Sequence, residues 1–104
     1  MSDAERHLEH YVAAVRFAQI SGFEVLEMLD VRSKLAECED KLTEPQKVQL
    51  EEADRFFFRD AAELYASVAA LGDLADMRQR AAAPRSHWWW YLDELVRAEK
   101  ASVG

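Results

Sequence analysis

Apolar positions along the first 42 residues recur every three or four residues. Between residues 4 and 18 they form one stripe, which consists of Leu8, Tyr11, Val12, Val15 and Ala18. After Ser21-Gly22 a second line has the 3-4-3-4 spacing of a coiled-coil seam and consists of Met28, Val31, Leu35, Cys38 and Leu42. This periodicity is typical of an amphipathic helix, so we expect one long helix over residues 4–42, bent or broken near Gly22.

The expected length of this helix leaves two interpretations open. An unbroken helix over residues 4–42 would be about 58 Å long. A compact domain of ~100 residues has a radius of gyration of only about 13 Å. Either the chain turns near Gly22, or a second molecule covers the far half of the helix.

Residues 42–46, Leu-Thr-Glu-Pro-Gln, predict a reversal of the chain. Thr43 and Gln46 have the spacing of a capping box, and Pro45 suits the first turn of a helix. The helix that follows carries an apolar face at Leu50, Ala53, Phe57, Ala61, Leu64, Val68 and Leu71. We expect it to run antiparallel to the first helix, and Gly72 either ends it or lies within it.

A shorter helix over residues 87–101 is expected after Pro84, with Ser86 as its cap. Few glycines and prolines, abundant helix-forming residues and the absence of period-two patterns predict an all-α fold. We expect residues 1–104 to form a single domain. It is an antiparallel bundle of two long helices, bent near Gly22 and at Gly72 if that residue interrupts the second helix, plus the C-terminal helix, and dimerisation completes it.

The run His87-Trp88-Trp89-Trp90-Tyr91 is the most informative stretch for function. Successive residues of a helix differ by about 100°, so three adjacent tryptophans cannot all face one core. By this pattern Trp90 lies on the polar side of its helix, and Phe56 lies on the polar side of the preceding one. Either the core is wide, or these rings contact a partner, because exposed aromatics mark interfaces. We expect the partner-binding residues to be Trp88, Trp90, Tyr91 and Phe56, with a homodimer as the simplest form and another protein as the alternative.

Charge and cysteine usage narrow the classes of partner and compartment. The net charge of −7 disfavours direct binding to nucleic-acid phosphates and favours a soluble acidic surface. Such a surface can also face a basic protein or mimic nucleic acid. Cys38 is the only cysteine, which predicts a reducing, cytoplasmic setting. No apolar leader follows Met1 and no stretch approaches about 18 apolar residues, so we expect no membrane association.

Two sets of side chains suggest a metal. His7, His10 and His87 could meet only if the fold joins the two ends of the chain, and His-x-x-His alone is a weak zinc signal. Glu24 with Glu27, and Asp60 with Glu63, are carboxylate pairs three residues apart, which share a helical face. If the two helices pack together, four carboxylates could hold Mg²⁺ or Mn²⁺ and activate water.

The segments 21–29 (Ser-Gly-Phe-Glu-Val-Leu-Glu-Met-Leu) and 60–65 (Asp-Ala-Ala-Glu-Leu-Tyr) resemble the acidic helices of all-α nucleoside triphosphate pyrophosphohydrolases of the MazG type. The resemblance implies that Glu24, Glu27, Asp60 and Glu63 bind the metal. Phe23 stands where that family has an acid, and Asp and Glu are exchanged in the second motif. This enzyme is therefore the alternative hypothesis. The main one is a non-enzymatic interaction and oligomerisation module with no catalytic residues and no cofactor.

Overall fold

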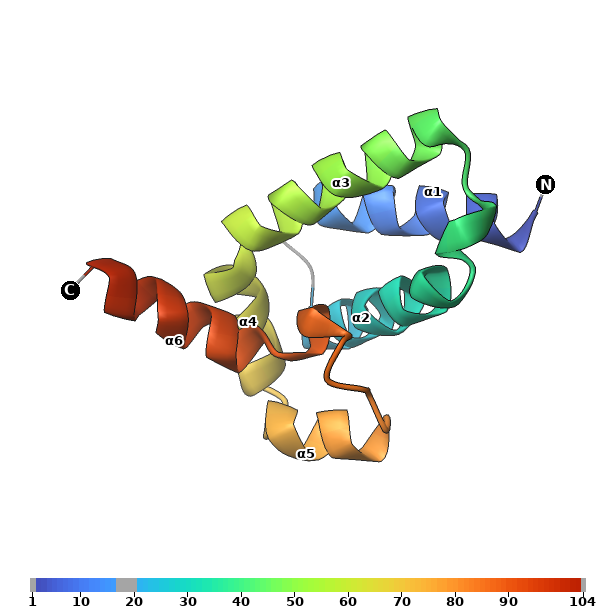
Figure 1. Ribbon diagram of the computed structural model, residues 1–104. Helices are drawn as coiled ribbons and strands as arrows, with labels where there is room; N and C mark the ends of the chain where they lie inside the picture. Colours follow the sequence, from blue (N-terminus) through green and yellow to red (C-terminus); the bar gives the residue numbers. More distant parts are fainter. Residues whose placement is uncertain (1, 17–20, 104) are drawn as a thin grey trace.

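The computed structural model describes residues 2–16 and 21–103, and it describes side chains as far as Ala98. The regular structure of these residues is helical (Figure 1). The elements are α1 (Asp3–Arg16), α2 (Gly22–Glu37), the short 3₁₀ turn η1 (Glu39–Lys41), α3 (Glu44–Arg59), α4 (Ala61–Ala69), α5 (Leu74–Arg80), the 3₁₀ turn η2 (Trp88–Trp90) and α6 (Leu92–Val103). The all-α prediction is confirmed, since no strand occurs in these ranges. No helix within them is both long and apolar enough to cross a bilayer.

The expected helix over residues 4–42 is divided, and its two halves pack against each other. α1 ends at Arg16 and α2 begins at Gly22, where the Ser21 hydroxyl accepts a hydrogen bond from the Glu24 N–H at 3.3 Å. Ala18, the last member of the predicted stripe, lies outside the described residues. Of the two interpretations, the turn of the chain is correct. The radius of gyration is 13.5 Å, which agrees with a chain that folds back on itself.

The predicted capping box at Thr43 and Gln46 is confirmed. The Thr43 hydroxyl accepts from the Gln46 N–H at 3.3 Å, and the Gln46 side chain accepts from the Thr43 N–H at 2.9 Å. The helix packing differs from the expected hairpin, however. α1 lies between α2 and α3, and both pack mainly on α1 rather than on each other (Figure 1). The break before Gly22 explains the difference, because it makes α1 an independent helix that fills the space between them.

The second expected long helix is three helices. Of the two alternatives left open at Gly72, the interruption is found, since α4 ends at Ala69 and α5 begins at Leu74. A further break at Asp60 was not expected. Phe57 and Ala61 on either side of it are both buried, so the apolar stripe passes through the break unchanged. A hydrophobic pattern therefore could not reveal it.

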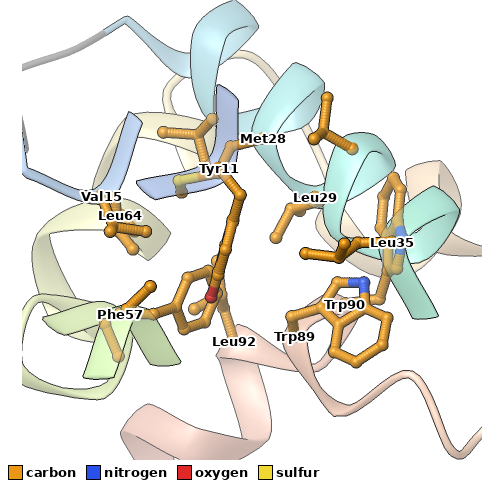
Figure 2. Packing of buried hydrophobic residues seen from close by; sticks show 14 of the residues in the cluster. Tyr11, Val15, Met28, Leu29, Leu35, Phe57, Leu64, Trp89, Trp90 and Leu92 are labelled. Carbon is orange, nitrogen blue, oxygen red and sulfur yellow. The ribbon is translucent and has the colours of Figure 1, made fainter. Parts of the chain in front are cut away.

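One core joins all the helices (Figure 2). The largest completely buried side chains are Tyr11, Phe57, Met28, Leu29, Leu35, Leu64 and Leu92. The predicted core stripes are largely right, and the main error is Leu71, which is exposed. Trp89 and Trp90 also belong to this core, on the side of α2 and α6 (Figure 2).

Candidate functional site

The tryptophan run is not part of the last helix. Trp88–Trp90 form the 3₁₀ turn η2, and α6 begins only at Leu92, because His87 (φ −84°, ψ 73°) and Tyr91 (φ −111°, ψ 42°) leave the helical region. The expected solvent-facing position of Trp90 is therefore wrong. Trp89 and Trp90 are 3% and 5% exposed, whereas Trp88 is only partly buried.

Ser33 on α2 holds this turn in place. Its Oγ accepts hydrogen bonds from Trp89 Nε1 at 2.9 Å and from Trp90 Nε1 at 3.0 Å. His87 Nδ1 lies 3.0 Å from the same oxygen. Indole N–H groups only donate, so they occupy both lone pairs of the hydroxyl and its single proton is left for His87. His87 Nδ1 is thus the acceptor, and the imidazole carries its proton on Nε2.

A serine beside a histidine raises the question of nucleophilic catalysis. Attack on a substrate requires a free lone pair on the serine oxygen. In this structure two indole donors hold both lone pairs of Ser33. The pair therefore has a structural role, which is to fix the tryptophan turn against α2.

Arg32, next to Ser33, is a buried charge in the same region. It is 4% exposed, and its Nε and Nη2 donate to the two carboxylate oxygens of Asp54 at 3.1 Å each. Tyr11 donates its hydroxyl to Asp54 Oδ1 at 2.6 Å. The guanidinium lies over the Trp89 ring at 4.3 Å and within 5.9 Å of the Trp88 ring. The bidentate pair and the ring faces offset part of the cost of burying the charge, although Arg32 Nη1 is buried without a hydrogen-bond partner among the described residues.

Trp88 lies between this core and the surface of the protein. Its ring packs edge-on against Phe57 and Trp89, with 5.4 Å between centroids in both cases. It also stacks face to face with Phe58, at 4.6 Å and 8°. Phe58 is 49% exposed, so this stack lies at the solvent boundary. The Trp88–Phe58 pair is therefore an apolar surface whose position is fixed by the contacts of Trp88 with Phe57 and Trp89.

A groove of about 300 Å³ opens beside Trp88, and we call it the α6 groove. It is lined by Arg85, Trp88, Tyr91, Glu94, Leu95 and Ala98. Tyr91, just before α6, and Leu95 and Ala98 on α6 have the i, i+4, i+7 spacing of one helical stripe. Leu92 and Val96 form the other stripe and are buried in the core. The stripe of Tyr91 is thus less deeply buried than that of Leu92, since Tyr91 and Leu95 are only partly buried against the core.

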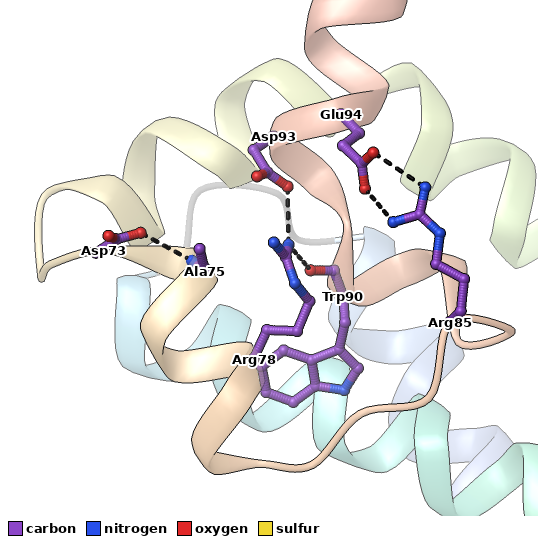
Figure 3. A network of polar contacts seen from close by, with 7 residues as sticks. All are labelled: Asp73, Ala75, Arg78, Arg85, Trp90, Asp93 and Glu94. Atoms are coloured by element: carbon purple, nitrogen blue, oxygen red, sulfur yellow. Dashed lines mark hydrogen bonds and ion pairs between the residues drawn. The ribbon is translucent and has the colours of Figure 1, made fainter.

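Polar contacts fix the walls of the α6 groove (Figure 3). The Tyr91 ring lies between two guanidinium groups, that of Arg78 at 4.2 Å and that of Arg85 at 4.5 Å. Arg78 donates to the Trp90 carbonyl at 3.1 Å and to Asp93 at 3.0 Å, and these contacts tie α5 to η2 and α6. Arg85 forms a bidentate pair with Glu94 at 2.7 and 3.1 Å, which holds the pKa of the Glu94 carboxyl below its usual value.

The expected partner-binding residues are thus divided. Trp88 and Tyr91 line the α6 groove, and Trp90 lies behind them in the core. Phe56 is half-buried against a separate hollow between α1 and α3, with the Arg59 guanidinium 4.6 Å from its ring centroid. Phe58, Arg85 and Leu95 were not expected at this site from the sequence. Phe58 and Leu95 both occur in apolar helical patterns, which do not distinguish a core face from a second, uncovered one.

The four carboxylates of the alternative hypothesis do not form a metal site. No group of three or more potential ligands converges among the described residues. Glu27 lies 3.6 Å from His10, and Asp60, at the break between α3 and α4, pairs with Arg59 at 3.2 Å. His10 and His87 belong to separate contacts as well. No protein-family model matches the sequence, and the comparisons with curated proteins and with solved structures give no match either.

Proposed function

We propose that this protein is a non-enzymatic helical interaction module that self-associates through the α6 groove. The observation that carries the proposal is the face-to-face stack of Trp88 and Phe58 at the edge of the groove. Rigid aromatic surfaces on a fixed base are typical centres of binding energy, because few rotatable bonds are lost when they become buried.

The distribution of charge supports a second copy as the partner. Residues 1–54 contain 13 acidic and six basic residues, so they carry the whole net charge of −7. Residues 55–104 contain seven of each and are neutral. The α6 groove belongs to the neutral half of the chain. Two copies that meet there keep their acidic halves apart, and their mutual repulsion is weakened further by salt screening.

Two substitutions test the proposal. Leu95→Asp places a charge in the lining of the groove, and Phe58→Asp places one on the ring that stacks on Trp88, so each should weaken the dimer by at least tenfold in sedimentation equilibrium. Val48→Asp is the matched control, because Val48 is an apolar residue of α3 that is 60% exposed and does not line the groove. Dissociation by Val48→Asp to the same extent, or no effect of either groove variant, would overturn the proposal. Circular dichroism of each variant reports whether it is folded.

A further inference from the structure

The hydroxyl of Ser33 has no hydrogen-bonding capacity to spare. The indole N–H groups of Trp89 and Trp90 donate to its Oγ at 2.9 and 3.0 Å, and His87 Nδ1 lies 3.0 Å from the same oxygen. A hydroxyl offers two lone pairs and one proton. The indoles take the lone pairs and the neutral imidazole takes the proton. All three side chains are therefore satisfied only while Nδ1 of His87 is an acceptor.

A second proton on the His87 ring is incompatible with this arrangement. An imidazolium donates from both of its nitrogens and accepts at neither. Three N–H donors would then meet one oxygen that has two lone pairs, so one donor must lose its acceptor. Trp89 and Trp90 are 3% and 5% exposed, whereas His87 is half-buried. His87 is therefore the side chain that can turn to water.

The stacking contact of His87 opposes a charge on its ring as well. The ring stacks on that of Trp89, with 4.6 Å between centroids and 25° between planes. The Arg32 guanidinium lies 4.3 Å from the centroid of the same Trp89 ring. A protonated His87 would thus be the second cation at one indole, and like charges in one place disfavour the charged form of each.

The other charged groups that flank this contact are exposed or paired with one another. On α2 they are Asp30 and Glu37, one turn to either side of Ser33, and Asp30 pairs with Lys34 at 3.2 Å. On the side of η2 and α6 they form the ion pairs Arg78–Asp93 and Arg85–Glu94. Salt screens the exposed charges, whereas the loss of a hydrogen bond does not depend on salt.

We infer that His87 makes the attachment of the tryptophan turn to α2 sensitive to acid. At neutral pH the uncharged ring accepts the Ser33 proton and holds η2 against α2. A histidine of the unfolded chain binds its second proton near pH 6.5, and the folded contact has no acceptor for it. The unfolded chain then binds more protons than the folded one, so stability falls as the pH drops through this range. η2 also carries Trp88, so acid loosens one wall of the α6 groove.

Urea denaturation at about pH 8 and about pH 5.5 tests the inference. The wild-type midpoint should be lower at the acidic pH by about 0.5 M or more, as expected when one partly buried hydrogen bond is lost. His87→Asn places an amide near the position of Nδ1 and does not titrate, so its midpoint should change by less than half as much. An equal fall in both proteins, or no fall in the wild type, would overturn the inference. So would a wild-type fall that disappears in about 0.5 M NaCl, because it would then arise from the exposed charges.

His10→Asn is the matched control. His10 lies 3.6 Å from Glu27 at the surface, and protonation strengthens that pair. The acid-induced fall should therefore persist without His10, and its disappearance would contradict the role given to His87. If His87→Asn does not fold, nuclear magnetic resonance of the wild type decides. The indole N–H signals of Trp89 and Trp90 should then shift with the same midpoint as the His87 ring, and constant indole signals would overturn the inference.

The inference is independent of the proposed function. The midpoints are compared at one fixed protein concentration, and the same comparison in Leu95→Asp should give the same acid-induced fall. A wild-type protein that is monomeric at every concentration would overturn self-association and leave the acid sensitivity of the tryptophan turn unaffected. A dimer whose stability is the same at both pH values would overturn the acid sensitivity alone.

Discussion

Ser33 Oγ lies 3.0 Å from His87 Nδ1, although 54 residues separate the two in sequence. The contact joins α2 to the loop that precedes the tryptophan turn. With both indole N–H groups directed at the same oxygen, Ser33 uses its full hydrogen-bonding capacity. One partly buried hydroxyl thus holds His87, Trp89 and Trp90, the residues on either side of Trp88.

Replacing Ser33 by alanine should lower the stability of the fold by more than the loss of one ordinary serine hydroxyl does. The substitution leaves the indole N–H groups of Trp89 and Trp90 without their acceptor in a partly buried site, so we expect a loss of about 2–4 kcal/mol in the free energy of unfolding. Urea denaturation followed by tryptophan fluorescence measures it. Ser67→Ala is the control, since that hydroxyl only donates to a helix carbonyl of α4, and it should change stability by less than about 0.5 kcal/mol. Equal effects of the two substitutions would contradict the role given to Ser33.

Removal of Asp54 should leave the Arg32 guanidinium buried without its counter-ion. We expect Asp54→Ala to lower the free energy of unfolding by about 3–5 kcal/mol. Arg32→Met in the same chain should recover part of that loss, because the unpaired charge is then gone. Asp30→Ala, which breaks an exposed pair with Lys34, should have an effect within about 0.5 kcal/mol. A double variant less stable than Asp54→Ala alone would show that the charge is not the source of the cost.

The stability of the fold should depend on Tyr11 at alkaline pH. Burial, and after it the neighbouring Asp54 carboxylate, raise the pKa of the Tyr11 phenol far above its usual range. The folded chain therefore keeps this proton when the unfolded chain loses it. The stability that Tyr11 contributes is complete below the unfolded pKa of about 10 and falls as the pH rises above it. Urea midpoints should fall more steeply with pH for the wild type than for Tyr11→Phe, and parallel curves would contradict this assignment.

Gly22 should be intolerant of a side chain even though it is helical. A Cβ at this position would lie 2.4 Å from the Ser67 carbonyl oxygen and 2.8 Å from Leu71. We expect Gly22→Ala to cost about 1–3 kcal/mol, because α2 and α4 would have to separate. Gly72→Ala meets only the flexible end of Met77 at 3.3 Å and serves as the control. Thermal denaturation of the two variants compares them, and a stabilised Gly22→Ala would show that the close approach of α2 to α4 is wrong.

Local signals in the sequence predicted much of the fold. The Thr43–Gln46 capping box, the interruption at Gly72 and most core stripes followed from spacing and residue type. The break between α1 and α2 was expected near Gly22, but the packing of α1 between α2 and α3 that follows from it was not. Whether a helix bends or reverses depends on what the two halves pack against, and the position of α1 between α2 and α3 is a tertiary property.

The candidate site was harder to predict because its residues depend on contacts between distant segments. The expected exposure of Trp90 depended on a continuous helix over residues 87–101. The 3₁₀ turn at Trp88–Trp90 interrupts that helix and turns Trp90 into the core. Ser33 and Arg32 carry no distinctive motif in sequence. Their partners are His87, Trp89 and Asp54, which only the folded chain brings near. Trp88 and Tyr91, in contrast, are partly buried and line the α6 groove, and their expected role in binding stays a prediction.

The mass of the wild-type protein in solution tests the central claim most directly. Light scattering during size-exclusion chromatography, carried out over a range of loading concentrations, should give a mass that rises towards twice the 12.0 kDa of one chain. Leu95→Asp should remain at the mass of one chain under the same conditions. A wild-type mass of 12.0 kDa at every concentration up to about 1 mM would contradict self-association through the α6 groove.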